Sequence, residues 1–158
     1  MRPIRSVLLF KLGLLAGMGV AAAIVKQAVP SVGDEDSDEL SLVAIFDGIE
    51  LKSRARSFKG GSMFAWFGGI DVDLRDVELA PGARLAVNTL FGGVALKTPP
   101  TWRIESNART VAGGVETRTQ AQDDPEAPVL TLDGMAVFGG IAVIAEPASE
   151  PAAGVSSR

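Results

Sequence analysis

The chain of 158 residues contains no cysteine, no histidine and no tyrosine. Without cysteine it has neither a disulfide framework nor a thiolate zinc site. The missing imidazole removes the commonest general base and the commonest metal ligand, and with them a nucleophilic triad. We therefore expect no metal and no cofactor, and we predict that the protein is not an enzyme.

Basic residues are unevenly distributed along the chain. Residues 1–26 contain four basic residues and no acidic one, whereas the remainder contains 11 basic and 19 acidic residues. This asymmetry is typical of a membrane-facing start followed by a solvated body. No basic stripe is long enough to follow a phosphate backbone, so we expect no nucleic-acid partner.

A long apolar run lies near the start of the chain. Val7 to Val25 are nineteen residues of which only Lys11 is charged. As a helix the run would span roughly 28 Å, close to the hydrocarbon thickness of a bilayer. We predict a single-pass membrane anchor within residues 1–26. A cleaved signal peptide is the alternative, because small residues at 21–23 follow a basic start; a soluble core helix is a third reading.

The flanking charges predict the orientation of this anchor. Arg2 and Arg5 precede the run, and Lys26 alone follows it closely. The positive-inside rule counts basic residues, so it favours a cytoplasmic N-terminus and a body outside the cytoplasm. The predicted localisation is the cell membrane, with the membrane itself and an envelope protein as partners.

Three further segments follow from composition. Residues 27–40 are polar and acidic, and we predict a solvated linker there. Residues 147–158 have no periodicity and are predicted to be a disordered tail. Residues 41–146 form the body, which contains an internal repeat.

The repeat is a six-residue motif that occurs five times, with starts 21, 24, 21 and 26 residues apart. Most copies combine phenylalanine, a glycine pair and alternating apolar residues. The spacing is typical of one supersecondary unit per repeat in a solenoid. The predicted corners are Phe46, Phe67-Gly68-Gly69, Phe91-Gly92-Gly93, Gly113-Gly114 and Phe138-Gly139-Gly140.

After each corner, apolar and polar residues alternate, as in Ile70, Val72 and Leu74. This is the period of a half-buried strand, and no helical period appears in the body. We expect each glycine pair to supply positive φ or to let neighbouring coils approach closely. We expect the corner phenylalanines to stack as an interior ladder. The predicted fold is an all-β, repeat-built solenoid of about five glycine-cornered units, preceded by one transmembrane helix.

The recurrent F-G-G-[IV]-x-[VL] corners, followed once by Pro99, Pro100 and Trp102, resemble the LiaF-like C-terminal domain. The resemblance covers about residues 41–146 and implies a β-solenoid of the toastrack type. It also implies a role in the bacterial response to cell-wall-active antibiotics, through protein–protein interaction. In that family the domain follows several membrane helices, is cytoplasmic and restrains a sensor kinase. One anchor and the opposite predicted sidedness depart from that pattern.

Two carboxylates are candidates for a catalytic or cation-binding role. Asp71 and Asp73 are two apart on a predicted strand, so both point the same way, roughly 7 Å apart. A glycosidase pair or a weak cation site uses such geometry. The favoured interpretation is the solvated polar face of an amphipathic strand.

The candidate interaction surface consists of one basic cluster and one aromatic residue: Lys52, Arg54, Arg56, Lys59 and Trp66. Three of the basic residues share a parity and hence one strand face, which suits an anionic polymer or lipid headgroups. For Phe64, Trp66 and Phe67 a recognition patch is one interpretation, and core and corner packing is the favoured one.

These patterns favour a non-catalytic, membrane-anchored envelope module. The alternative is a secreted polymer- or ligand-binding β-domain released by signal cleavage. A carboxylate-dependent hydrolase using Asp71 and Asp73 is a third reading. End-to-end self-association is compatible with the open strand edges of a solenoid.

Overall fold

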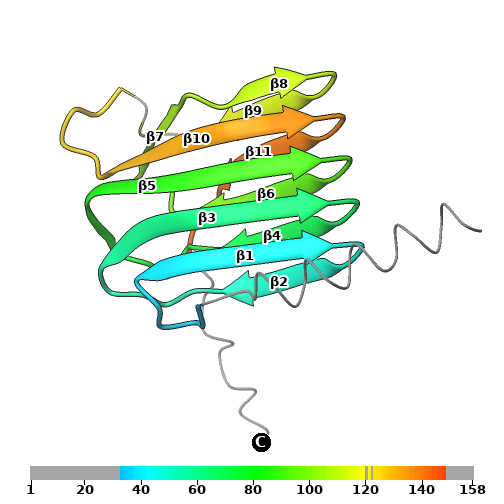
Figure 1. Ribbon diagram of the computed structural model, residues 1–158. Coiled ribbons are helices and arrows are strands. Elements are labelled where there is room, and N and C mark those ends of the chain that lie inside the picture. The colour runs from blue at the N-terminus through cyan, green and yellow to red at the C-terminus, as the bar shows by residue number, and fades with distance from the viewer. Residues whose placement is uncertain (1–32, 120, 122, 149–158) are drawn as a thin grey trace, which may run out of the picture. The chain divides into compact units, whose positions relative to one another are not determined.

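A computed structural model describes residues 33–119, 121 and 123–148 (Figure 1). These residues form an all-β structure, a parallel β-solenoid, and none of them is helical. The predicted anchor, the cleavage site of the alternative signal peptide and most of the predicted tail lie outside the described residues. The predicted all-β class and solenoid architecture are confirmed for the body.

Eleven strands make up the solenoid. They are β1 (Glu39–Ile45), β2 (Gly48–Lys52), β3 (Phe58–Trp66), β4 (Gly69–Asp73), β5 (Leu79–Leu90), β6 (Gly93–Thr98), β7 (Arg103–Ser106), β8 (Arg109–Val111), β9 (Gly114–Arg118), β10 (Val129–Val137) and β11 (Gly140–Ala145).

The strands form two parallel sheets that face each other. Sheet A has the order β1-β3-β5-β10-β7, with β8 also pairing with β10, and sheet B has the order β2-β4-β6-β11-β9. Each unit crosses from sheet A to sheet B at one of the five predicted corners. The register is regular: in sheet B, Gly69 lies beside Gly48 and Gly93, and Ile70 beside Ile49 and Val94.

The core lies between the two sheets. Inward residues alternate with outward ones on both sheets, as the period-two pattern predicts. Leu42, Met63, Val87 and Leu132 from sheet A, with Val72 from sheet B, are almost fully buried. Trp102, next to the proline pair, is buried as well.

The order of the units in space differs from their order in the chain. The last unit, β10–β11, lies between the third (β5–β6) and the fourth (β7–β9), as the orange strand between green and yellow-green ones shows (Figure 1). The fourth unit has the short strands and the most exposed side chains. Because it offers the least apolar surface, the stack is more stable with this unit at the end and the apolar last unit inside.

The body begins earlier than predicted. β1 starts at Glu39, and Leu40, which was assigned to the linker, is fully buried. The preceding acidic residues are hydrogen-bonded to the body: the Glu35 carbonyl accepts from the Arg54 N–H at 2.6 Å, and the Asp38 carbonyl from the Lys59 N–H at 2.7 Å. The described end of the acidic segment is therefore docked on the body.

Candidate functional site

The five corners differ from the prediction in one detail of the backbone. Positive φ belongs to the residue before each corner pair, with values of 50–54° at the four phenylalanines and at Ala112. The first glycine of each pair serves the predicted close approach instead. A Cβ on Gly68 would lie 2.3 Å from the Asp47 carbonyl oxygen, and one on Gly139 would lie 2.0 Å from that of Gly92. The same carbonyls accept hydrogen bonds from the adjacent unit, as Gly69 N–H donates to Asp47 at 3.2 Å.

The four corner phenylalanines form a stacked ladder. Ring centroids of Phe46, Phe67, Phe91 and Phe138 follow one another at 5.1, 4.8 and 5.0 Å, with interplanar angles of 3–9°. The spacing equals the separation of neighbouring strands, so each unit adds one ring. The predicted stacking is confirmed.

The predicted interior position of this ladder is wrong. The four rings are 40–56% exposed. The inward residues nearest to the corners are small, namely Ala44, Ala65, Thr89 and Ala136, and all are buried. Because the sheets converge at the corner, the interior has room only for small side chains there. A residue in the left-handed conformation then directs its ring outward.

The ladder continues onto the outer face of sheet A. The residues that precede the corners form one row in register: Ile45, Trp66, Leu90, Val137 and Val111. Within this row Ile45 is buried and Val111 is exposed. Trp66 is half-buried, and its ring lies 6.1 Å from Phe46 and 6.2 Å from Phe67. A second outward row contains Val43, Phe64, Asn88, Met135 and Arg109.

We call the ladder and these two rows the aromatic corner. Every large hydrophobic residue that is exposed among the described residues belongs to it: Phe46, Phe64, Phe67, Phe91, Val111, Met135 and Phe138. From strand spacing and residue rise, the surface measures roughly 25 Å by 15 Å. That is the size of the largest apolar patch on a typical monomer, which is often functional.

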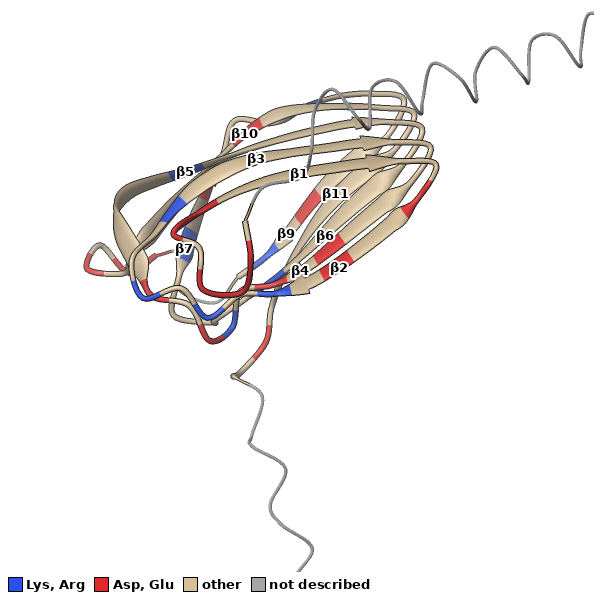
Figure 2. Ribbon diagram, turned by 60° about the horizontal axis from the view of Figure 1, so that its bottom comes forward, with Lys and Arg blue, Asp and Glu red and all other residues tan. Residues whose placement is uncertain are grey.

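The charged residues lie elsewhere. On the five corner loops the only charged residue is Asp47, and Figure 2 shows the corner end largely free of charge. Charged residues gather on the outer face of sheet B and at the edge opposite the corners. The corner end of the body is therefore apolar, whereas the opposite edge and the outer face of sheet B are charged.

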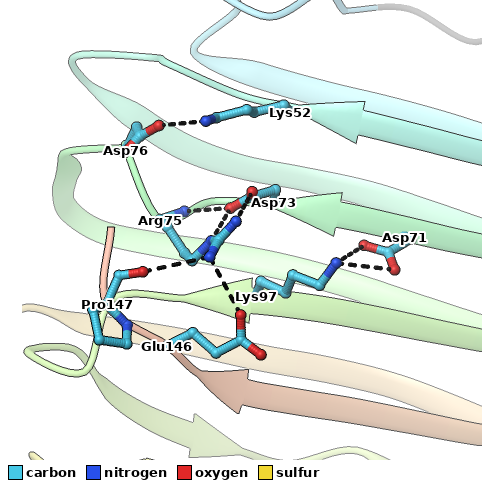
Figure 3. Close-up of polar contacts among 8 residues, drawn as sticks. All are labelled: Lys52, Asp71, Asp73, Arg75, Asp76, Lys97, Glu146 and Pro147. Carbon is cyan, nitrogen blue, oxygen red and sulfur yellow. Dashed lines mark hydrogen bonds and ion pairs between the residues drawn. The ribbon is translucent and has the colours of Figure 1, made fainter. Parts of the chain in front are cut away.

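A network of ion pairs occupies that opposite region (Figure 3). Arg75 donates to both carboxylate oxygens of Asp73, at 2.8 and 2.6 Å, and to Glu146 at 3.3 Å. It also donates to the Pro147 carbonyl at 3.5 Å, which fixes the chain after β11. The remaining pairs are Lys52–Asp76 at 2.8 Å and Lys97–Asp71 at 3.3 Å.

The two candidate carboxylates belong to this network. Asp71 and Asp73 lie on the outer face of β4, each paired with its own cation, as the polar-face interpretation expects. The side-chain hydrogen bonds of Arg75 hold the pKa of Asp73 below its ordinary value. A general acid at neutral pH needs a raised pKa, so the shift of Asp73 has the wrong sign for that role.

Two residues of the predicted basic cluster lie close to carboxylates, and the other two are exposed to solvent. Lys52, Arg54 and Arg56 do point outward and alternate with buried Ser53 and Ala55. Lys52 is paired with Asp76, and Arg54 lies 3.6 Å from Glu35. Arg56 and Lys59 are exposed. The cluster lies where β2 ends and β3 begins, at the edge away from the corners, so the structure separates it from Trp66.

The local interpretation of Phe64, Trp66 and Phe67 as core and corner packing needs correction. The corner interrupts the alternation of the strand, and the rings of Trp66 and Phe67 reach the same surface. A signal for this was present in the sequence. The residue before each corner is large and apolar in all five copies, and its parity is opposite to that of the buried Ala44 and Ala65.

A shallow groove crosses the outer face of sheet B. Its floor is the row of second corner glycines, and Glu50, Asp71 and Glu116 line it. Among the described residues no group of three or more potential metal ligands comes together. Within them there is also no helix of the length and apolarity that a bilayer span requires.

Comparison of the chain with protein-family models, with curated proteins and with solved structures finds no match in any of the three. The LiaF-like resemblance therefore stays a prediction from the glycine corners.

Proposed function

We propose that this chain is a non-catalytic, membrane-anchored module of the cell envelope that works by surface contact through its aromatic corner. The observation that carries the proposal is the gathering of the exposed large hydrophobics on one charge-poor surface. Holding a phenylalanine in the left-handed region costs about 1–2 kcal/mol, and leaving its ring half in water forfeits further stabilisation. Stability alone does not favour such residues at four corners, so a binding role accounts for them better.

The anchor in this proposal is the apolar run at 7–25. Its length suits a bilayer, and the two arginines before it favour a body outside the cytoplasm. A role in tuning the response to cell-wall-active antibiotics rests on the LiaF-like resemblance, as does the toastrack type of the solenoid. The resemblance marks the fold more than the chemistry.

A secreted, polymer-binding domain gains less support from the corner. Sugars stack on the faces of aromatic rings, but in this ladder the faces of Phe67 and Phe91 are covered by their neighbours. The rings present mainly their edges. Such a surface suits an apolar partner better than a polysaccharide.

Sidedness and retention test the proposal directly. Because the chain has no cysteine, Ser156→Cys and Ser6→Cys each create a single thiol, after and before the apolar run. We expect a membrane-impermeant maleimide to label position 156 in intact cells and position 6 only after lysis, with both variants in the membrane fraction. The reverse labelling pattern would place the body in the cytoplasm, and a shortened protein in the soluble fraction would favour the secreted alternative.

A further inference from the structure

The aromatic corner differs from the rest of the described body because its large apolar side chains are exposed. We propose that this corner lies in the headgroup–acyl boundary of the bilayer that anchors the chain, so that the solenoid rests on the membrane by one edge. This inference rests on the proposed anchor. It goes beyond it, because a tethered domain need not touch the bilayer.

The chemistry of the surface fits that boundary. Phenylalanine rings and one half-buried tryptophan project from a rigid backbone, and membrane interfaces favour aromatic side chains at this depth. Arg109 ends the outward row that contains Phe64 and Met135. A guanidinium at that rim is placed to reach lipid phosphates while its stem stays with the apolar row.

The connection is long enough for this placement. The apolar run ends at Val25 and the chain is hydrogen-bonded to the body from Glu35 onward, so nine residues, 26–34, lie between them. Such a segment reaches at most roughly 32 Å, whereas β1, which leads to the corner, covers about 23 Å. The short connection also holds the body near the bilayer and raises the local concentration of lipid at its surface.

A second copy of the chain is a weaker occupant. The corner offers roughly 400 Å² per copy, so a symmetric pair would bury about 800 Å², below the 1,200 Å² or more of stable interfaces. The ladder is also a ridge, which needs a complementary groove on a protein partner. A fluid bilayer covers a ridge without any such complementarity.

The charge of the body determines which lipid is the appropriate probe. Outside residues 1–26 the chain carries 11 basic and 19 acidic residues, so strongly anionic lipid would repel the body as a whole. Zwitterionic lipid does not repel the body, and only the burial of the apolar side chains of the corner then favours binding. Vesicles of phosphatidylcholine are therefore the appropriate probe.

The two tryptophans provide an internal test. Trp66 belongs to the corner and Trp102 is buried in the core. The full-length chain is reconstituted into phosphatidylcholine vesicles with or without bromine atoms on the acyl chains, which quench tryptophan at that depth. We expect the emission of Trp66 to fall by about twofold or more on brominated lipid. A Trp66→Phe variant, which retains only Trp102, is expected to change little.

A triple variant links the quenching to the corner. Phe67→Asn, Phe91→Asn and Phe138→Asn remove the rings, and asparagine tolerates the left-handed backbone. Quenching of Trp66 should be lost, while the matched set Ala95→Asn, Ala142→Asn and Ile144→Asn on the outer face of sheet B should retain it. If the triple variant does not fold by near-ultraviolet circular dichroism, Phe138→Asn alone replaces it, with reduced quenching expected.

Each other outcome has a defined meaning. A chain that does not float with the vesicles contradicts the anchor, and this inference falls with it. A chain that floats with Trp66 unquenched leaves the anchor intact and overturns the contact with lipid. Quenching that survives loss of the rings also overturns it. Concentration-dependent shielding of Trp66 from aqueous acrylamide, without quenching by bromine, would assign the corner to a second copy.

Discussion

The two outer faces of this solenoid are built by the same repeat and yet differ in character. On sheet A, the outward row next to the corners is apolar, the second row is apolar except for Asn88 and Arg109, and both lead to the phenylalanine ladder. On sheet B, the corresponding rows hold glycines, alanines and paired charges such as Asp71 with Lys97. The core uses only the inward positions of each strand, so the outward positions are not constrained by packing. A difference between the two outer faces is thus evidence about contacts and not about folding.

The largest expected effect contrasts a core phenylalanine with a corner one. Phe58 is fully buried, so Phe58→Ala should cost about 3–5 kcal/mol of unfolding free energy. Phe138→Asn removes a ring that is 56% exposed and should cost about 1 kcal/mol or less. Urea unfolding of both variants checks the difference. Equal losses would show that the ladder is a structural part of the core, contrary to the proposed binding role.

The first glycine of one corner and the second glycine of another should differ next. Gly139→Ala places a Cβ against the Gly92 carbonyl and should destabilise the fold by about 2–3 kcal/mol, because backbone has to move. At Gly114 nothing lies within 4 Å of the added Cβ, so Gly114→Ala should be close to neutral. The shift in the urea midpoint distinguishes them. A similar cost at both positions would contradict the close approach of the corners.

Removal of a buried hydroxyl should change the free energy of unfolding by a smaller amount and should raise it. Thr98 is fully buried at the end of β6, and its hydroxyl has no hydrogen-bond partner among the described residues. Replacing it by valine removes an unsatisfied polar group at nearly constant shape, so Thr98→Val should stabilise by about 1 kcal/mol. Thermal unfolding measures the gain, with the exposed Thr110→Val as the control. A loss of stability at Thr98 would indicate a partner outside the described part of the chain.

The polar face of sheet B should add a pH dependence that the corner lacks. The pKa of Asp73 is lowered in the folded state by Arg75, so the folded state favours the ionised carboxylate. Its contribution is present above the ordinary carboxyl pKa and is lost as pH falls through the lower folded value. Asp73→Asn should therefore flatten the acid side of the stability profile. If wild type and variant lose stability in parallel on acidification, the pair with Arg75 contributes nothing measurable.

Much of the fold follows from sequence because the repeat is strict. The structure confirms three features that are local in the sequence. They are the five corners, the alternation of Ile70, Val72 and Leu74, and the outward parity of Lys52, Arg54 and Arg56. The close approach at the corners was also foreseen, because only a residue without Cβ allows it.

Three features were not predictable in the same way. The outward position of Phe46 and its counterparts depends on how closely the two sheets converge, which is a tertiary property. Positive φ at the phenylalanine, and not at the glycine, depends on the hydrogen bonds between adjacent units. The location of the last unit between the third and fourth depends on a competition between whole units for burial. The aromatic corner combines all three, which is why the sequence indicated Trp66 but not the surface around it.

The inserted last unit also sets the order in which the chain completes its fold. Sheet A strands β1, β3 and β5 pair in chain order, so the first three units can assemble while synthesis continues. Among the described residues the fourth unit pairs only with β10 and β11, which follow it in the chain. The long-range step is the pairing of β10 with β5, which places Thr131 beside Arg84, 47 residues earlier in the chain, and it is expected to be late and slow. Until β10 and β11 have paired with them, the edges of β5 and β6 stay open, and this interval is when the newly made chain is most prone to mispair with another copy.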